Sequence, residues 1–168
     1  MLALAPLPAA ETVPLKSALE RVLAQDIVAV RDQPPFAASA MDGYALRSSD
    51  TPGTLQLIGE SSAGHGFEGY CEAGTAVRIS TGAAMPDGAD TIVIQENVRR
   101  DGDGITVPAT EAGKNIRPRG CDFTAGTVLL STGRRLDGVA LSLVAASGLA
   151  QLAVARAPRI AILSSGDE

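Results

Sequence analysis

The chain has 168 residues, of which 45% are hydrophobic and 20% charged, so it can bury a core and we do not expect it to be disordered. Its formal net charge of −5 argues against a nucleic-acid partner, because such partners require a basic face. No run of about eighteen apolar residues occurs, so we expect no membrane span.

The scarcity of histidine and cysteine argues against several kinds of catalytic site. His65 is the single histidine, which argues against a zinc site and against a Ser-His-Asp triad within the chain. Cys71 and Cys121 lie far apart, which is the pattern of neither a metal site nor a disulfide framework. We therefore expect a cytoplasmic protein whose chemistry depends on carboxylates, arginines, hydroxyls and a bound cation.

The first forty residues predict one helix and one strand. Apolar residues recur at helical spacing over 14–24, and Pro14 suits a first helical turn, where its missing N–H has no partner to lose. A strand is expected over 27–30, before the prolines that follow Gln33.

The middle of the chain, from Thr54 to about Leu130, alternates short apolar runs with glycine-containing turns. These signals predict a compact β module with strands over 54–58, 76–80, 91–97, 105–107 and 127–130. Residues 100–104 are a typical hairpin connection between the third and fourth of these strands. Residues 64–69 match the dinucleotide-binding pattern G-x-G-x-x-G, but no helix pattern follows, so we interpret these glycines as turn residues.

A second helix is expected over 137–147, with Asp137 as its N-cap and Gly148 just past its end, and a strand is expected over 151–155. We expect this helix and strand to pack with the first helix and strand in one small α/β layer. Residues 159–163 form a continuous apolar run, as in a strand buried on both faces.

The predicted fold class is therefore α+β and mainly β, with the β module inserted into the small α/β layer. The domain boundaries follow from this arrangement. Residues 1–40 and 121–157 would form the α/β layer, residues 41–120 the inserted module, and residues 158–168 the start of a truncated α/β domain.

Four polar segments could carry chemistry. Residues 34–45 contain Asp42 and Gly43, which alone indicate ordinary turn chemistry. In residues 78–90 a strand runs into a turn at Thr81 and Gly82, whose hydroxyl and N–H groups could hold an oxyanion, although most such turns hold nothing. The fourth segment is the terminal turn that ends at Glu168.

The third segment, residues 114–122, is the most basic stretch of this acidic chain. Pro118 should force Arg117 into extended backbone, so that Arg117 and Arg119 lie on a stiff segment. Asp122 could pair with an arginine or bind a cation, and the whole loop could equally be a solvated one. Together the segments indicate an anionic substrate and a hard cation such as Mg²⁺, but no particular reaction.

The order of these segments resembles that of the molybdopterin molybdenumtransferases, the MoeA and gephyrin E-domain family. The family's Pro-Pro-Phe and Ser-Ala-Met-Asp-Gly-Tyr-Ala stand at 34–45, and its Arg-Ile-x-Thr-Gly-Ala run stands within 78–90. Its Asn-Ile-Arg-x-Arg-Gly-x-Asp stands at 115–122, and its Gly-x-Arg-Leu at 133–136 with one extra residue. Its Pro-Arg-x-Ala-Ile-Leu-Ser-x-Gly-Asp-Glu stands at 158–168.

This resemblance implies an enzyme that takes adenylylated molybdopterin and molybdate and, with Mg²⁺, releases AMP and forms molybdenum cofactor. It also implies an elongated homodimer with clefts between subunits, and the molybdopterin adenylyltransferase as a partner. The chain would be the N-terminal part of such an enzyme, cut at the start of the molybdopterin-binding domain, and inactive alone.

The resemblance also assigns roles to individual residues. Its catalytic residues would be Asp42, Asp122 and Glu168, of which Asp42 and Glu168 would also bind the metal. Its substrate-binding residues would be Thr81, Gly82, Arg117 and Arg119. The chain departs from the family at Ala37 and Ala38, which replace a usual Asp-Asn, at Pro118, which replaces an arginine, and at Cys121, which replaces a glutamate.

Two other functions compete with this one. A non-catalytic scaffold or partner-binding module is one, since some relatives are also anchoring proteins, but the sequence shows no exposed apolar stripe. A separate sugar- or nucleotide-binding β domain is the other, but it would not require four motifs in this order.

Overall fold

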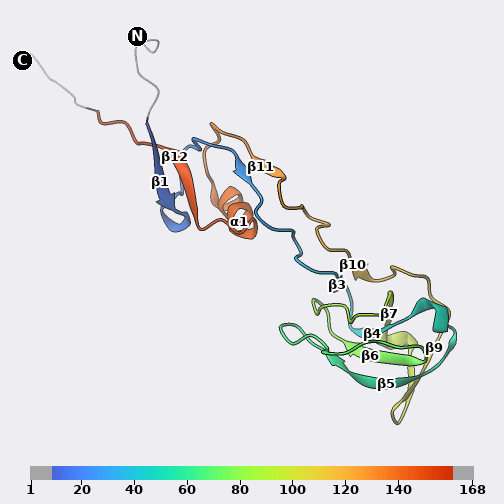
Figure 1. The fold of residues 1–168 in the computed structure, drawn as a ribbon. Coiled ribbons are helices and arrows are strands. Elements are labelled where there is room, and N and C mark those ends of the chain that lie inside the picture. The colour runs from blue at the N-terminus through green and yellow to red at the C-terminus, as the bar shows by residue number, and fades with distance from the viewer. Residues whose placement is uncertain (1–8, 161–168) are drawn as a thin grey trace, which may run out of the picture. The chain divides into compact units, whose positions relative to one another are not determined.

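The computed structural model describes residues 9–160, which form two compact units (Figure 1). The first unit combines residues up to Arg31 with those from Thr124 onward, and the second comprises residues 32–123. The sequence had placed these divisions at residues 40 and 120. Each unit has its own buried core, so each is described separately below.

The first unit contains two antiparallel strand pairs and the one α-helix of the described residues. Strand β1 (Ala10–Pro14) pairs with β12 (Gln151–Ala155), and β2 (Ile27–Val28) pairs with β11 (Val128–Leu130) (Figure 1). Helix α1 (Gly138–Ala146) packs with them. The buried core of this unit comprises Ala18, Leu23, Ile27, Leu130, Leu136, Ala140, Val144, Leu152 and Val154.

The helix predicted over 14–24 is wrong. Pro14 ends strand β1, and only the 3₁₀ turn η2 (Leu15–Ser17) follows. The backbone beyond it bonds to distant segments instead: the N–H groups of Leu15 and Leu23 donate to carbonyls of Ala150 and Arg134. The apolar spacing reflects burial of individual residues along an extended path, so tertiary pairing overrode the local helical signal. The strand expected over 27–30 is found as β2, which is shorter and ends at Val28.

Helix α1 confirms the second predicted helix. Its N-cap is Asp137, whose side chain accepts a hydrogen bond from the N–H of Ala140 at 2.7 Å. Gly148 follows the helix with φ +92°, a conformation that favours glycine. No described helix is long and apolar enough to cross a membrane.

The second unit is built on a six-stranded sheet in the order β7-β4-β6-β5-β9-β8. All neighbours are antiparallel except β5 and β6, which are parallel. The strands are β4 (Gly43–Leu46), β5 (Gly53–Ser61), β6 (Thr75–Ile79), β7 (Thr91–Ile94), β8 (Arg99–Asp101) and β9 (Gly104–Val107). A separate antiparallel pair joins β3 (Ala38–Ser39) to β10 (Ile116–Arg117), and the 3₁₀ turns are η3 (Ser48–Asp50) and η4 (Gln95–Asn97).

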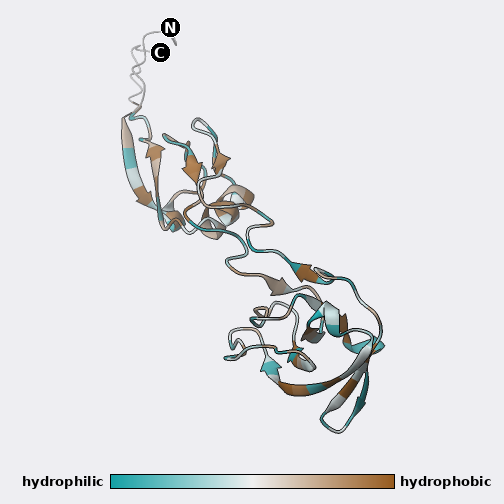
Figure 2. Cartoon of the chain, turned by 45° about the vertical axis from the view of Figure 1, so that its right-hand side comes forward, coloured by the Kyte–Doolittle hydropathy of each residue, from teal (hydrophilic) through white to brown (hydrophobic). Residues whose placement is uncertain are grey.

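Both faces of this sheet are covered near strand β4. Alternate residues of β4 enter two clusters: Tyr44 and Leu46 belong to one, and Ala45 to the other. The first cluster adds Leu55, Ala76, Val93, Ile105 and Val107, and the second adds Ile79, Ala83 and Ile92. In Figure 2 the more hydrophobic colours lie mainly on strands and the helix. The edge strand β8 consists of three charged residues, all exposed.

The mainly β fold class is confirmed, and the five strands predicted for the β module are found with small shifts, although the last of them, β11, belongs to the first unit. Two details were wrong. The segment 91–97 is strand only to Ile94 and then turns into η4, so the hairpin at residues 100–104 joins β8 to β9 and not β7 to β9. Strand β4 was not predicted. The strand expected over 159–163 lies largely outside the described residues, and Arg159 and Ile160 belong to no strand.

Candidate functional site

Asp42 and Thr81 form the centre of the candidate site. Asp42 ends the bend between β3 and β4, and Thr81 begins the turn that follows β6. Because β4 and β6 are paired and antiparallel, the start of one lies beside the end of the other. Oδ1 of Asp42 accepts two hydrogen bonds from Thr81, one from its N–H at 2.7 Å and one from its hydroxyl at 2.8 Å.

These hydrogen bonds favour the ionised form of Asp42. The N–H of Thr81 is the main cause that lowers the pKa of Asp42, and the Thr81 hydroxyl lowers it further; desolvation opposes them, and the Arg78 charge adds a smaller lowering. The carboxylate therefore stays ionised to a lower pH than an ordinary aspartate. No described residue donates to Oδ2, so this oxygen can serve a cation or a substrate.

Arg78 and Gln95 also hold the loop that contains Asp42, and no role was predicted for either residue. Arg78 donates to the carbonyl of Gly43 at 2.9 Å and to Oε1 of Gln95 at 2.6 Å, and its guanidinium lies 5.2 Å from the centroid of the Tyr44 ring. The N–H of Gln95 donates to the Asp42 carbonyl at 3.1 Å. Arg78 stands in a motif that resembles the family, which was the available signal.

The Asp42-Gly43 pair was expected to be an ordinary turn, but Gly43 also has a packing role. Gly43 is the first residue of β4, and a Cβ at this position would lie 2.2 Å from the carbonyl oxygen of Val93 on β7. A side chain would therefore separate β4 from β7. The glycine allows close strand pairing directly beside Asp42.

The turn at Thr81 and Gly82 does not offer its N–H groups as expected. The Thr81 N–H donates to Asp42, and the Gly82 N–H donates to the carbonyl of Ser39 at 2.9 Å. Both donors are thus satisfied within the chain, and the negative group held by Thr81 is a carboxylate of the protein. A binding role for Thr81 and Gly82 stays a prediction, with Asp42 as the group through which Thr81 acts.

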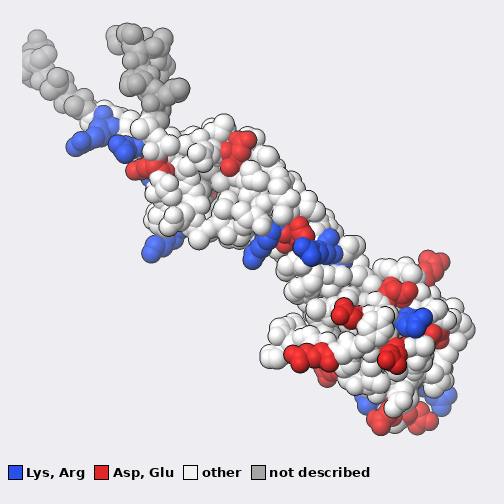
Figure 3. All heavy atoms as spheres, viewed as in Figure 1, with Lys and Arg blue, Asp and Glu red and all other residues white. Residues whose placement is uncertain are grey.

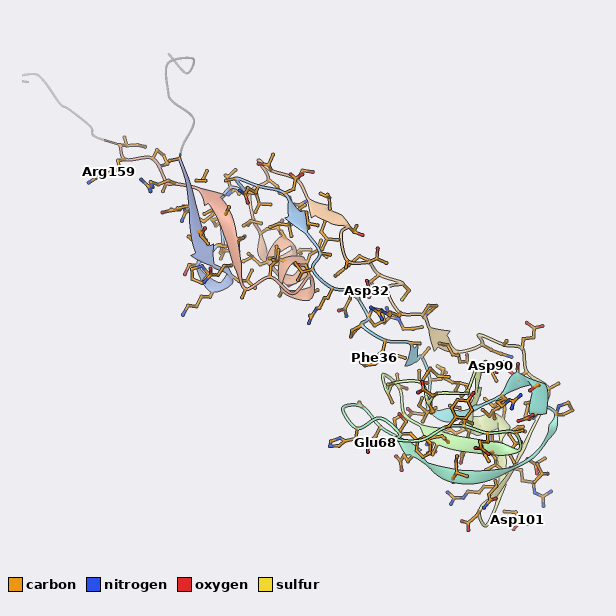
Figure 4. The ribbon with its side chains drawn as sticks, in the orientation of Figure 1. Asp32, Phe36, Glu68, Asp90, Asp101 and Arg159 are labelled. Atoms are coloured by element: carbon orange, nitrogen blue, oxygen red, sulfur yellow. The ribbon has the colours of Figure 1, made fainter. Side chains whose placement is uncertain are left out.

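The basic loop places its two arginines apart. Arg117 lies in β10, in the extended conformation expected before proline, and ion-pairs with Asp122 at 2.8 Å. Hydrogen bonds to Cys121 and the charge of Asp122 raise the pKa of Arg117, which is charged at any physiological pH. Arg119 instead donates from Nε to Asp32 at 2.5 Å (Asp32 is labelled in Figure 4).

The predicted substrate-binding residues line two neighbouring pockets. The first, about 420 Å³, is lined by Phe36, Ser39, Thr81, Gly82 and Arg117 among others. The second, about 450 Å³, contains Arg119, and the two share only Pro35 and Phe36 in their walls. The structure therefore brings Thr81, Gly82 and Arg117 together around one pocket and leaves Arg119 in the next.

The metal assignment stays a prediction. No group of three or more histidine, cysteine, aspartate or glutamate side chains among residues 9–160 is placed to hold an ion. Glu168, the second expected ligand, lies outside the described residues. The free Oδ2 of Asp42 nevertheless suits Mg²⁺, which commonly takes one or two carboxylates together with substrate phosphates and waters.

Charge is mixed over the visible face. Figure 3 shows acidic and basic side chains interspersed on each unit, without a large field of one sign. On this face, attraction of an anion would therefore come from individual arginines at short range, since surface charges are screened over about 10 Å at 0.1 M salt.

Comparison with known proteins gives a consistent result. Residues 1–148 match the family model described as the MoeA N-terminal region (domain I and II). A molybdopterin molybdenumtransferase of Haemophilus influenzae is 41% identical over 159 residues, which is 92% of this chain and 39% of that protein. Gephyrin of Dictyostelium discoideum is 34% identical over 180 residues, covering 94% of this chain and 24% of gephyrin.

A solved structure agrees with these matches. The molybdopterin biosynthesis MoeA protein of Pyrococcus horikoshii superposes with a TM-score of 0.88 at 33% identity, covering 94% of this chain and 42% of that one. The chain thus spans about two fifths of the length of the transferases it matches.

We predict that Thr81→Val raises the pKa of Asp42 while leaving it below the ordinary value of 3.8. Valine removes the hydroxyl donor but keeps the N–H, which is the larger cause of the lowering. Carboxyl-carbon NMR titration measures this pKa, and Thr81→Ser is the matched control. A pKa that does not change in Thr81→Val would show that the hydroxyl does not hold the carboxylate.

The sign of the pH dependence follows. The folded pKa of Asp42 is lowered, so its ionised form stabilises the fold above the unfolded pKa, and this contribution is lost as pH falls through the folded pKa. Thr81→Val should therefore lose stability relative to the wild type at neutral pH, and the difference should shrink under acid conditions.

Proposed function

Because the chain belongs to the family of the MoeA N-terminal region, we propose that it is the N-terminal part of a molybdopterin molybdenumtransferase. The whole enzyme would insert molybdate into adenylylated molybdopterin, release AMP and form molybdenum cofactor. The observation that carries the proposal is the ionised Asp42, held by Thr81 beside a pocket with Arg117. The relatives named above are transferases of this name, so a role in molybdenum cofactor biosynthesis has the broadest support.

Each residue has a chemical task in this proposal. Asp42 presents its free oxygen to Mg²⁺, which would supply charge neutralisation at the substrate phosphates. Thr81 orients the carboxylate through two hydrogen bonds and favours its ionised form. Arg117 offers its remaining N–H groups to an oxyanion, and Asp122 orients Arg117 through their ion pair. Glu168 would complete the metal site.

Arg119 would bind a second anionic group of the same substrate. It lies in the pocket beside that of Arg117, and its side chain is 67% exposed although Nε donates to Asp32. A substrate with two phosphoryl groups could reach both arginines. Adenylylated molybdopterin has two such groups, joined in one diphosphate bridge.

The wider setting is also proposed. The enzyme would act as a homodimer in the cytoplasm and receive its substrate from the molybdopterin adenylyltransferase. Because the chain covers only about two fifths of the related transferases, residues 1–168 alone would be inactive.

We predict that Asp42→Ala abolishes molybdate insertion in a protein of the relatives' full length that contains this chain. The assay combines adenylylated molybdopterin, molybdate and Mg²⁺ and measures AMP and cofactor. The fold should survive, because the side chain is on an exposed loop and its removal frees only the exposed donors of Thr81. Asp101→Ala, on the exposed strand β8, is the matched control. A wild-type rate in Asp42→Ala would reduce Asp42 to a loop residue, and turnover by residues 1–168 alone would refute the claim of inactivity.

Replacing Arg117 and Arg119 together with alanine should weaken substrate binding far more than stability. Charge-assisted hydrogen bonds to an oxyanion correspond to roughly ten- to hundredfold in affinity per arginine. The loss should be largest at low salt, and calorimetric titration of adenylylated molybdopterin into the full-length protein measures it. The matched control replaces Arg99 and Arg100, which are exposed on β8. Equal affinities across the salt range would make the two loop arginines ordinary surface residues.

A further inference from the structure

Two aromatic side chains are exposed: one lines a pocket, and the other packs against a glycine of the same pocket. All five aromatic residues lie in the described part of the chain. Tyr44 is buried, Phe67 and Phe123 are half-buried, and only Phe36 and Tyr70 are exposed, at 46% and 61%. Exposed rings are flat apolar surfaces that a ligand can cover.

Phe36 forms one wall of the pocket that contains Arg119. Figure 4 labels Phe36 on the segment that leads to β3. Tyr70 reaches the same place from another loop, since its ring covers Gly88, which also lines the pocket. A Cβ at Gly88 would lie 2.7 Å from Cε1 of Tyr70, so a side chain there would displace the ring.

Charged groups complete the pocket on two sides. Arg119 is held through Nε by Asp32, which leaves its terminal nitrogens for an anion. Asp87 is exposed in the same pocket and can accept hydrogen bonds from ring N–H groups. An aromatic wall, a cation and a carboxylate therefore surround about 450 Å³.

We propose that this pocket binds a planar nitrogen heterocycle that carries a phosphate, with the ring against Phe36 and the phosphate at Arg119. The assignment rests on the proposed function where it names the source of the ring, because adenylylated molybdopterin has a pterin and an adenine. Asp87 favours the pterin. A 2-amino-4-oxo edge presents two N–H donors to a carboxylate, whereas the adenine edge sets a ring acceptor beside its amino group.

The test uses commercial nucleotides and the 168-residue chain. Guanine has the same 2-amino-4-oxo edge as a pterin, so GMP should bind more tightly than AMP, and ribose 5-phosphate should bind more weakly than either. Calorimetric titration measures all three. Phe36→Leu, which keeps apolar bulk and removes the ring, should weaken GMP about tenfold, and Phe36→Tyr should restore it. Val139→Ala, on an exposed position of α1, is the control.

The charged groups give two further readouts. Arg119→Gln should weaken GMP and AMP alike by about tenfold, whereas the matched Arg100→Gln on β8 should change neither. Asp87→Asn should remove the preference for GMP over AMP. A preference for AMP in the wild type would assign the pocket to the adenine and overturn the role of Asp87.

The outcomes separate this inference from the transferase proposal. Unchanged GMP affinity in Phe36→Leu would overturn the ring site, and the transferase would stand if Asp42→Ala still abolished insertion. If GMP binding depends on Phe36 but the full-length protein inserts no molybdate, the ring-binding site would stand and the transferase proposal would be rejected.

Discussion

Strand β4 is the constraint on which the second unit depends. It pairs with β6 on one side and β7 on the other, and both of its faces are buried. Gly43 allows its first residue to approach the β7 backbone. This fixed strand delivers Asp42 to the end of β6, where Thr81 binds it, so the candidate site is a consequence of strand register and not of loop flexibility.

The second consequence of this arrangement is electrostatic. Two donors of Thr81 and the nearby Arg78 lower the pKa of Asp42 and so stabilise its ionised form. Arg78, on β6, donates to Gly43 and to Gln95, and the N–H of Gln95, which follows β7, donates to Asp42. The site is therefore supported by side chains that line neither pocket, as preorganised sites require.

Much of the fold could be predicted from the sequence, and the failures have physical causes. Helix α1 carries its own cap and C-terminal glycine, so local signals sufficed. Residues 14–24 have helical spacing, but their backbone pairs with Ala150 and Arg134, which no local pattern reveals. Strand β4 is buried on both faces and lacks alternating polarity, so its four residues gave no strand period.

The site followed a similar division. The extended Arg117 could be predicted from Pro118, because that constraint is local. The bond between Asp42 and Thr81 could not, because it depends on the register of β4 against β6. The pairing of Arg119 with Asp32 and the use of the Thr81 and Gly82 donors within the chain are also long-range, so spacing alone made these donors seem free for a substrate.

The coupling of Asp42 to Thr81 is the central claim, and a double-mutant cycle tests it most directly. The cycle compares the free energy of unfolding at neutral pH of the wild type, Asp42→Ala, Thr81→Val and the double variant. If Thr81 and Asp42 act as one pair, Thr81→Val destabilises the wild type but has no further effect once Asp42 is replaced. Additive losses would contradict this account, since Thr81 would then stabilise the fold independently of Asp42.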